Sequence, residues 1–214
     1  MQTDKNYWNG YYSKAPKEIS MPSDFAKFVM DHMQAGKKLI DLGCGNGRDS
    51  VYFCNNGIRV TAVDSSKSAI EFIDNYQIPI FAVCDDFVET KALACIDYDY
   101  CYARWTIHAI NKAQQNKLLP NVYHALNENG LLFVEVRTIN DAKYGQGEPL
   151  GEHEFFFDNH YRRFIDPSKL ITQIKEVGFE IVSHEESDAF SVVGSDAPTL
   201  LRLIAKKPSS SATH

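Results

Sequence analysis

The feature that most constrains the fold is a set of three glycines placed directly after a short apolar segment. Residues 39–47 read LIDLGCGNG, so an apolar run of strand character leads straight into the glycines. These glycines are Gly43, Gly45 and Gly47. Glycine adopts backbone conformations that a Cβ forbids and lets a ligand approach the main chain. A helical pattern follows, and the free N–H groups of its first turn point at the same place. The run therefore predicts a ligand-binding turn between a strand and a helix.

Short apolar runs and helical patterns alternate through most of the chain. This alternation is typical of an α/β fold, in which a parallel sheet carries helices on both faces. The predicted strands are 38–42, 59–63, 80–84, 99–103, 131–136, 180–184 and 200–206. The predicted helices are 22–33, 46–56, 66–76, 113–127 and 167–177. The last helix has the clearest ends, because Asp166 and Pro167 suit its start and Gly178 suits its end.

Length and composition fit one domain. A chain of 214 residues with 44% hydrophobic and 23% charged residues suits a single α/β domain and excludes general disorder. We predict one domain over residues 1–207, with an aromatic, irregular lid segment at 1–20. A substrate-side insertion at 140–165 is expected as a long loop, because its sequence fits neither helix nor strand. Residues 208–214 are expected to form a flexible tail.

Charge and residue usage exclude several kinds of partner. A net charge of −6 argues against nucleic-acid binding, which needs a basic surface. No apolar run is long enough to span a bilayer and no signal-peptide pattern opens the chain, so we expect a cytoplasmic protein that binds no membrane. The five cysteines show neither a CxxC pair nor zinc-like spacing, so no metal is expected. Nothing in the sequence indicates the oligomeric state.

Acidic residues close three consecutive predicted strands. Asp41 precedes the glycines by two positions, Asp64 ends the second strand, and the pair Asp85 and Asp86 follows the third. A carboxylate beside the glycines suits a ligand with an ammonium group, and one about 20 residues later suits ribose hydroxyls. Dinucleotide enzymes use the spacing GxGxxG, whereas this chain has GxGxG and places Arg48 at the third glycine position. The pattern therefore favours S-adenosylmethionine (SAM) over NAD.

The runs IDLGCGNGRDS, AVDSS and CDDF resemble the motifs of the class I SAM-dependent methyltransferase family. The resemblance covers residues 36–207 and implies a seven-stranded, mostly parallel sheet of order 3-2-1-4-5-7-6 whose last strand is antiparallel. It also implies that the chain is an enzyme with SAM as its cofactor. The SAM site would be formed by Asp41, Gly43, Cys44, Gly45, Gly47, Asp64, Ser65, Asp85, Asp86 and Phe87.

The aromatic N-terminus is predicted to cover this site. In many class I enzymes the segment before the first motif folds over the cofactor, where an aromatic face can contact the sulfonium. Trp8 and Tyr12 are therefore assigned to the cofactor, and Arg104 at the end of the fourth strand is assigned there as well. Packing of the aromatic residues against the edge of the sheet is the alternative.

Basic and aromatic side chains follow the fourth and fifth strands and recur in the insertion. The predicted substrate-binding residues are Arg104, Arg137, Tyr144, Tyr161, Arg162 and Arg163. Guanidinium groups bind carboxylate or phosphate through paired hydrogen bonds, so the set predicts a small anionic metabolite or a sugar-type acceptor. Each arginine could instead pair with a carboxylate of the chain. Because Arg162 and Arg163 are adjacent, only one is expected to point inward.

His108 and His160 are the predicted catalytic residues. A hydroxyl acceptor would need a general base, and these histidines lie on the catalytic edge. A carboxylate or thiolate acceptor would need no base. Two other functions stay open: methylation of a protein or a lipid-linked glycan, and a non-catalytic SAM-binding regulatory role.

Overall fold

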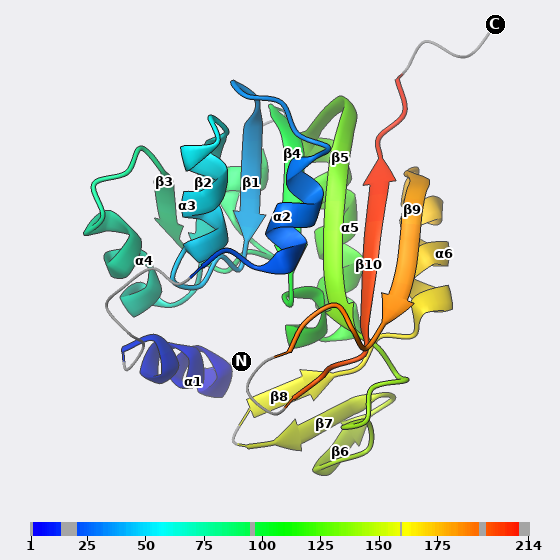
Figure 1. The fold of residues 1–214 in the computed structure, drawn as a ribbon. Helices are drawn as coiled ribbons and strands as arrows, with labels where there is room; N and C mark the ends of the chain where they lie inside the picture. The colour runs from blue at the N-terminus through cyan, green and yellow to red at the C-terminus, as the bar shows by residue number, and fades with distance from the viewer. Residues whose placement is uncertain (1, 14–20, 95–96, 159, 193–195, 210–214) are drawn as a thin grey trace, which may run out of the picture.

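The computed structural model describes residues 2–13, 21–94, 97–158, 160–192 and 196–209, and it centres on a seven-stranded sheet (Figure 1). In chain order the strands are β1 (Lys38–Leu42), β2 (Arg59–Asp64), β3 (Phe81–Cys84), β4 (Tyr98–Arg104), β5 (Leu126–Arg137), β9 (Glu180–Ser187) and β10 (Leu200–Lys206). Their order is β3-β2-β1-β4-β5-β10-β9, parallel as far as β5. β10 runs antiparallel to both of its neighbours. The predicted order, with its antiparallel last strand, is confirmed.

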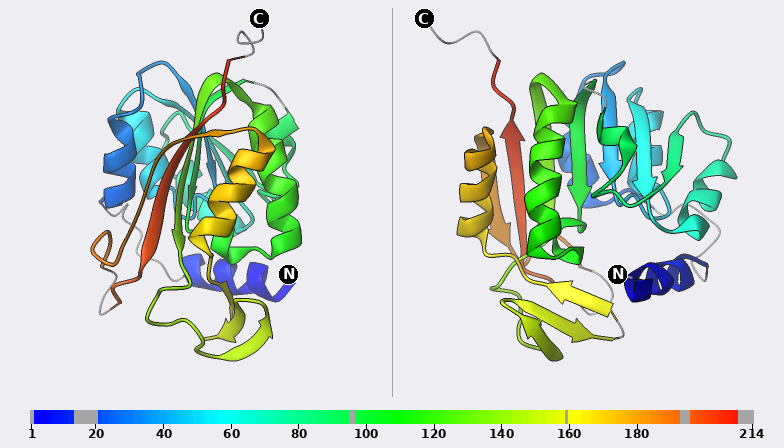
Figure 2. Two further views of the ribbon diagram at one scale, coloured as in Figure 1. Left: turned by 90° about the vertical axis from the view of Figure 1, so that its right-hand side faces the viewer. Right: turned by 180° about the vertical axis from the view of Figure 1, so that it is seen from behind.

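Helices cover both faces of this sheet (Figure 1, Figure 2). One face carries α2 (Asp24–Met30), α3 (Arg48–Asn55) and α4 (Lys67–Asp74), and the other carries the 3-10 helix η1 (Lys91–Ala94), α5 (Lys112–Ala125) and α6 (Pro167–Val177). Successive strand residues point to opposite faces. On β4, Cys101 and Ala103 therefore join the core under α5 and α6, whereas Tyr100 and Tyr102 join the core under α2 and α3.

The predicted ends of α6 are confirmed, whereas the end of α5 differs. Asp166 Oδ1 accepts hydrogen bonds from the N–H groups of Ser168 and Lys169, and Gly178 ends the helix with φ +115°. The sequence predicted a helix to residue 127, but Leu126 is already extended and begins β5. Leu126 is fully buried, so its packing in the core turns the chain into the sheet.

Residues 140–165, expected as a long loop, instead contain a three-stranded antiparallel sheet. Its strands are β6 (Glu148–Gly151), β7 (Glu154–Phe157) and β8 (His160–Arg163), in that order. An aromatic cluster holds this small sheet together, because the rings of Tyr144, Phe155 and Phe164 pack with centroids 5.5 to 5.9 Å apart. The small sheet lies beyond the carboxyl ends of the main strands (Figure 1), and β8 contacts the short 3-10 helix η2 (Ile107–Ala109).

The aromatic N-terminus forms a helix, α1 (Gln2–Ser13), where an irregular segment was predicted. This helix lies across the same edge of the main sheet and contacts α4 and β8 (Figure 1, Figure 2). Residues 14–20 of the predicted lid segment and 210–214 of the predicted tail lie outside the described residues. Within the described ranges, no helix combines the length and apolar character needed to cross a membrane.

Candidate active site

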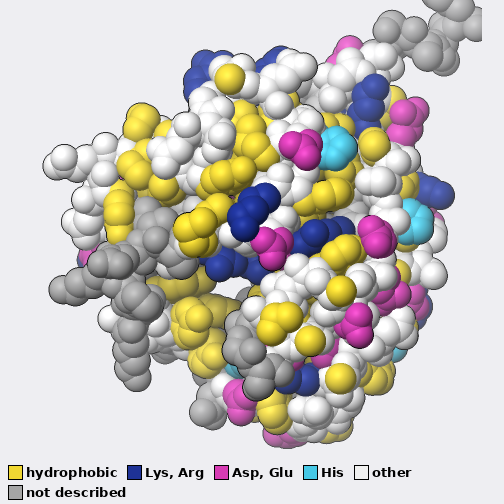
Figure 3. All heavy atoms as spheres, viewed as in Figure 1, with side chains coloured by type: hydrophobic (Ala, Val, Ile, Leu, Met, Phe, Trp, Pro, Cys, Tyr) yellow, Lys and Arg dark blue, Asp and Glu magenta, His cyan; other side chains and the backbone are white. Residues whose placement is uncertain are grey.

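A cavity of about 560 Å³ lies where the carboxyl ends of β1, β2, β4 and β5 meet α1 and the small sheet. Ligands of open parallel sheets bind at this edge. Figure 3 shows basic side chains gathered at the hollow between the main sheet and the small sheet. The volume is in the range of small-molecule sites.

The glycine turn forms one wall of the cavity. Gly43 and Gly45 have φ values of +75° and +55°, a region that residues with a Cβ rarely adopt. A Cβ on Gly43 would overlap the side chain of Thr106, and a Cβ on Gly45 would overlap Tyr12. The amide of Gly43 also donates to the carbonyl of Val63 at 2.8 Å. The turn is therefore fixed against β2 and leaves no room for larger residues.

Two buried carboxylates flank this turn. Asp41 accepts a hydrogen bond from Ser50 Oγ at 2.6 Å, and burial raises the pKa of Asp41 to about 7. Asp64 accepts from the N–H groups of Gly45 at 2.9 Å and Ser66 at 2.8 Å, and burial raises its pKa as well. A carboxylate has more lone pairs than these contacts use, so both groups can still accept hydrogen bonds from a ligand.

Most predicted cofactor residues line the cavity, namely Trp8, Tyr12, Asp41, Gly43, Cys44, Asp64, Ser65, Phe87 and Arg104. Gly45 and Gly47 belong to the turn itself, and both have positive φ. Asp85 and Asp86 are not among the residues that line the cavity. Asp85 accepts from the N–H of Asp86, and Asp86 accepts from the N–H of Val88, each at 2.9 Å. These two carboxylates therefore shape the turn after β3, and their contact with a ligand stays a prediction.

A buried network beside the cavity was missed by the sequence reasoning. Asp49 accepts hydrogen bonds from the N–H of Ser23 at 2.7 Å, from Ser23 Oγ at 2.8 Å and from the hydroxyl of Tyr102 at 2.9 Å. Ser23 is also the N-cap of α2. The network ties α2, α3 and β4 together. In the sequence, Asp49 is an acidic residue in the first turn of a predicted helix. Such residues are common because they interact favourably with the helix dipole, so its position gave no sign of the network.

Helix α1 closes one side of the cavity. Tyr12 lies against Gly45 of the glycine turn. Tyr7 stacks on His160 of β8, with ring centroids 4.6 Å apart. Asn9 Oδ1 accepts a hydrogen bond from Ser66 Oγ at 3.1 Å. The helix thus contacts both the cofactor-side turn and the small sheet, which is the placement expected of a lid.

Arg104 is paired with a carboxylate of the chain. Glu135 of β5 is fully buried, and its Oε1 lies 3.0 Å from Arg104 Nε. Arg202 of β10 donates to Oε2 of the same carboxylate at 2.8 Å. Trp105 Nε1 donates to Oε1 at 2.9 Å. The charge of Arg104 is therefore balanced inside the protein, which is the alternative that the sequence left open.

Trp105 is a second residue that the sequence reasoning missed. It lines the cavity, and the guanidinium groups of Arg104 and Arg137 lie 4.5 and 5.5 Å from its ring centroid. Its φ of +60° is unusual for a bulky residue, and such strained backbone clusters at functional sites. A tryptophan after a strand carries no signal of this conformation, because the sequence alone does not show its backbone angles.

Arg137 is also balanced by carboxylates. Its Nη1 donates to Asp141 Oδ2 at 3.0 Å, and its Nη2 donates to Asp196 Oδ2. Lys143 Nζ lies 2.9 Å from the same oxygen of Asp196. We expected Arg104 and Arg137 to bind an anionic acceptor, but both have internal partners and are poorly available for that role.

Arg163 differs from these two arginines. It is only 6% exposed and lines the cavity, yet no carboxylate of the described residues lies within 4 Å of its guanidinium. Its Nη2 donates to the carbonyl of Ile107 at 2.9 Å and to Gln115 Oε1, and its buried Nε has no partner among the described residues. Arg162 lines the cavity too, so both of the adjacent arginines contribute to its wall.

The two predicted catalytic histidines both line the cavity. His108 Nδ1 accepts a hydrogen bond from the backbone N–H of Arg137 at 3.0 Å. His160 Nε2 accepts from Arg162 Nε at 2.9 Å, and its Nδ1 lies 3.2 Å from the carbonyl oxygen of Asp158. Burial, together with the neighbouring arginines, holds the pKa of His108 well below its usual value. These contacts disfavour both histidines as general bases.

The two predicted tyrosines are placed differently. Tyr161 lines the cavity, whereas Tyr144 does not. The hydroxyl of Tyr144 lies 2.8 Å from His153 Nδ1, so this side chain makes its contact within the insertion that holds the small sheet.

No group of three or more histidine, cysteine, aspartate or glutamate residues that could hold a metal ion occurs in the part of the chain that the structure describes.

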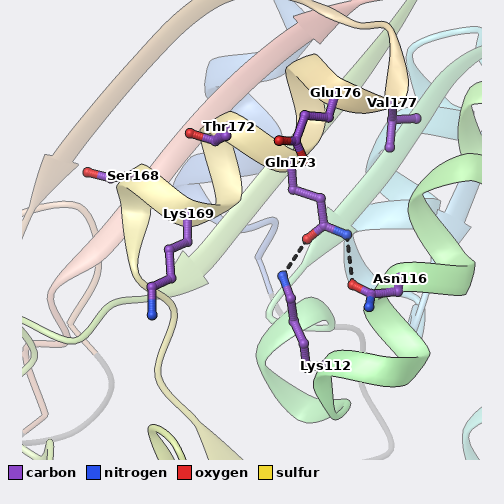
Figure 4. Close-up of a pocket in the computed structure, with 8 residues that line it drawn as sticks. All are labelled: Lys112, Asn116, Ser168, Lys169, Thr172, Gln173, Glu176 and Val177. Carbon is purple, nitrogen blue, oxygen red and sulfur yellow. Dashed lines mark hydrogen bonds between the residues drawn. The ribbon is translucent and has the colours of Figure 1, made fainter.

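Polar side chains in a groove between α5 and α6 are connected through hydrogen bonds to Arg163, which lines the cavity. Gln173 Oε1 accepts from Lys112 Nζ at 2.6 Å, and Gln173 Nε2 donates to Asn116 Oδ1 at 3.0 Å (Figure 4). The same Gln173 oxygen accepts from Gln115 Nε2 at 2.7 Å, and Gln115 holds Arg163 through its other amide atom. This chain of amides fixes the position of the Arg163 guanidinium.

Comparison with known proteins identifies the family. A family model described as a methyltransferase domain matches residues 15–184. The ubiquinone biosynthesis O-methyltransferase of Coxiella burnetii is 27% identical over 189 residues, which cover 81% of this chain and 76% of that protein. The carboxy-S-adenosyl-L-methionine synthase of Actinobacillus pleuropneumoniae is 28% identical over 109 residues, which cover 45% of this chain and 43% of that protein.

Solved structures share the fold. A SAM-dependent methyltransferase from Methanosarcina mazei superposes with a TM-score of 0.74 at 15% identity, covering 85% of this chain and 97% of that one. The chain spans about half the length of the first curated relatives that it matches, with 43%, 51% and 56% of their lengths covered. The family model covers most of the chain, and the sheet order agrees with it. The chain therefore belongs to the methyltransferase-domain family, within the class I SAM-dependent methyltransferases.

Proposed function

We propose that this chain transfers the methyl group of SAM to a small anionic metabolite bound in the cavity. The acceptor class rests on Arg163, a buried guanidinium at the cavity with no carboxylate of the described residues within 4 Å. Glu154 on the neighbouring strand β7 acts on this guanidinium electrostatically but does not contact it, and a buried charge without a contacting counter-ion is costly. The negative charge of a bound acceptor would remove that cost, and Arg162 beside it would add a second cation.

The cofactor half of the cavity fits SAM. Asp41 beside the glycine turn suits an ammonium group, and Asp64 suits hydroxyl groups. Thr106 Oγ1 is buried against the turn without a partner among the described residues, so a ligand there would satisfy it. SAM, when bound, supplies a methyl group on a sulfonium that leaves as a neutral thioether. The residues of the chain align the acceptor, and the aromatic side chains of α1 exclude water.

The enclosed cavity favours a small acceptor over a protein or a lipid-linked glycan. Helix α1 and β8 approach each other over the site, because Tyr7 and His160 stack with ring centroids 4.6 Å apart. A sugar-type acceptor fits only if it carries a negative charge, since a neutral sugar would leave Arg163 without a counter-ion. A non-catalytic role would require SAM binding without turnover.

The proposal is tested with pairs of acceptors that differ only in charge. Carboxylic acids of common metabolites and their amides are incubated with the enzyme and SAM, and S-adenosylhomocysteine is measured. We expect turnover of charged members and little turnover of their neutral partners. Efficient turnover of neutral members would contradict the anionic acceptor. SAM binding with no turnover across the whole panel would favour the regulatory alternative.

Substitution of Arg163 should act on the acceptor alone. Because a hydrogen bond to a charged group contributes about 1.5–3 kcal/mol, we expect Arg163→Gln to raise the acceptor KM by roughly ten- to hundredfold. The KM for SAM should change little, because no cofactor residue contacts this guanidinium. Arg59→Gln is the matched control, since Arg59 lies at the end of β2 away from the cavity and its Nε donates to the Gly36 carbonyl at 2.8 Å. Steady-state kinetics with both substrates varied would measure the difference, and equal effects on both KM values would contradict it.

Binding of SAM should depend on pH through Asp41. With its pKa raised to about 7, this carboxyl is partly protonated at neutral pH, and an ammonium group beside it would favour the charged form. Binding then releases a proton, so affinity rises as the pH rises through about 7. It falls again above about pH 8, where the α-amino group of SAM loses its proton.

Calorimetry in buffers of different ionisation enthalpy would count the protons released. Asp41→Asn should keep only the fall at high pH, because the side chain no longer titrates. An affinity in the wild type that stays constant between about pH 6 and pH 7.5 would contradict the assigned contact.

A further inference from the structure

His108 is held at the carboxyl edge of the sheet with its two ring nitrogens in different surroundings. It lies in η2, directly after β4, and its ring lines the cavity. Nδ1 accepts a hydrogen bond from the backbone N–H of Arg137, the last residue of β5, at 3.0 Å. The position of the ring is therefore set by two adjacent strands of the main sheet rather than by a flexible loop.

This contact decides which nitrogen carries the proton. A backbone N–H can only donate, so Nδ1 must present a lone pair. A neutral imidazole has one ring proton, which must then be on Nε2. Nε2 is the nitrogen left to face the cavity, since no described residue makes a hydrogen bond to it.

The surroundings keep the ring neutral. Burial disfavours the charged form of the ring, and four guanidinium groups add to this effect, those of Arg137, Arg163, Arg104 and Arg162. A second proton on the ring would add a fifth positive charge to this group and would break the contact from the Arg137 amide. The ring is thus a neutral donor under ordinary conditions.

We propose that His108 is a specificity-determining residue whose Nε2–H donates a hydrogen bond to an oxygen of the acceptor's anionic group. The inference rests on the proposed function, because it takes the acceptor to be anionic. It replaces the general-base role predicted from the sequence, since a nitrogen that already carries its proton cannot remove one. An oxyanion accepts from this donor and from Arg163. An ammonium group in the same place would set donor against donor, and an amide would offer one accepting oxygen and turn its NH2 towards one of the two donors, which leaves buried polar groups unpaired and which a site of this kind rejects strongly.

Two variants separate a donor from a base. His108→Asn keeps an oxygen near Nδ1 for the Arg137 amide but loses the Nε2 donor. His108→Gln can place an N–H near the position of Nε2. With the best carboxylate of the charge-paired panel as acceptor, we expect the Asn variant to raise the acceptor KM about tenfold or more and the Gln variant to stay close to the wild type. The pH profile of kcat/KM should keep its shape in both variants. Loss of kcat by a hundredfold or more in both, with the acidic limb of the profile removed, is the signature of a base and would overturn the proposal.

The tautomer can be read without any turnover. Nitrogen NMR on the ring of His108 is recorded in protein labelled at histidine and saturated with S-adenosylhomocysteine, with the signal assigned from the His108→Gln variant. We expect a neutral ring protonated at Nε2 at about pH 7. Acetate should shift the Nε2–H signal, whereas acetamide should not. A proton on Nδ1, or no response to acetate, would overturn the role of His108. The expected tautomer and acetate response, without methylation of any anionic acceptor, would instead count against the proposed function alone.

Discussion

Replacing Glu135 by alanine is expected to lower the free energy of unfolding by about 3–5 kcal/mol. The carboxylate is fully buried and binds the guanidinium groups of Arg104 and Arg202, whose side chains are only 14% and 11% exposed. Without it, two cations stay in a low-dielectric interior with no counter-charge. Trp105 also loses the acceptor for its indole N–H. Urea denaturation, followed by far-ultraviolet circular dichroism, measures the loss.

An exposed ion pair provides the control. Glu89 pairs with Lys117 at 3.0 Å, but these side chains are 63% and 65% exposed. Solvent screens such pairs, so Glu89→Ala should change the free energy of unfolding by less than about 1 kcal/mol. Similar losses for the two variants would show that the buried cluster around Glu135 does not stabilise the fold in the way described.

Removal of residues 1–13 is expected to lower kcat at least a hundredfold while leaving the fold in place. Helix α1 covers the cavity through Tyr12 and Tyr7, and without it water enters and the acceptor loses its alignment. Neither core cluster contains any of the α1 side chains that the structure describes, those of residues 7–13. The midpoint of thermal unfolding should therefore fall by less than about 4 °C, which corresponds to about 1 kcal/mol for a chain of this size.

The thermal scan and the kinetic assay must be read together. Ser13→Ala is the control within the helix, because Ser13 is exposed, is not among the residues that line the cavity, and donates its hydroxyl to the Gly10 carbonyl at 2.9 Å, so its loss should affect kcat little. A truncated protein that fails to fold would make α1 part of the core. A truncated protein with wild-type kcat would exclude the lid.

The glycine turn and the carboxylates beside it could be predicted from the sequence because their signals are local. Gly43 and Gly45 are needed for their own backbone angles, and Asp64 binds the turn that lies beside it in the sheet. The order of the strands was implied by the resemblance to the class I family that these motifs carry, and the alternation of strands and helices indicated only a parallel sheet covered on both faces. Such features need only the spacing of residues along the chain.

The acceptor half could not be predicted because it depends on pairing between distant residues. Arg137 meets Asp196, 59 positions away, and Arg163 meets Gln115, 48 positions away. In the sequence the four arginines look alike. In the structure Arg104, Arg137 and Arg162 each lie within 4 Å of a carboxylate, whereas Arg163 has no carboxylate of the described residues within that distance. The short strands of the small sheet gave no clear period, so their residues could not be assigned to a face.

The small sheet leaves and rejoins the main fold at neighbouring points. Thr138, directly after β5, forms a bridge with Ile165, two residues before the start of α6, and the N–H of Ile139 donates to the Ile165 carbonyl at 3.0 Å. Segments whose ends lie side by side can be lengthened, shortened or exchanged without moving the elements that flank them. Under the proposed function, Arg162 and Arg163 of this segment bind the acceptor, so the choice of acceptor can diverge in evolution through replacement of a single module while the glycine turn stays unchanged.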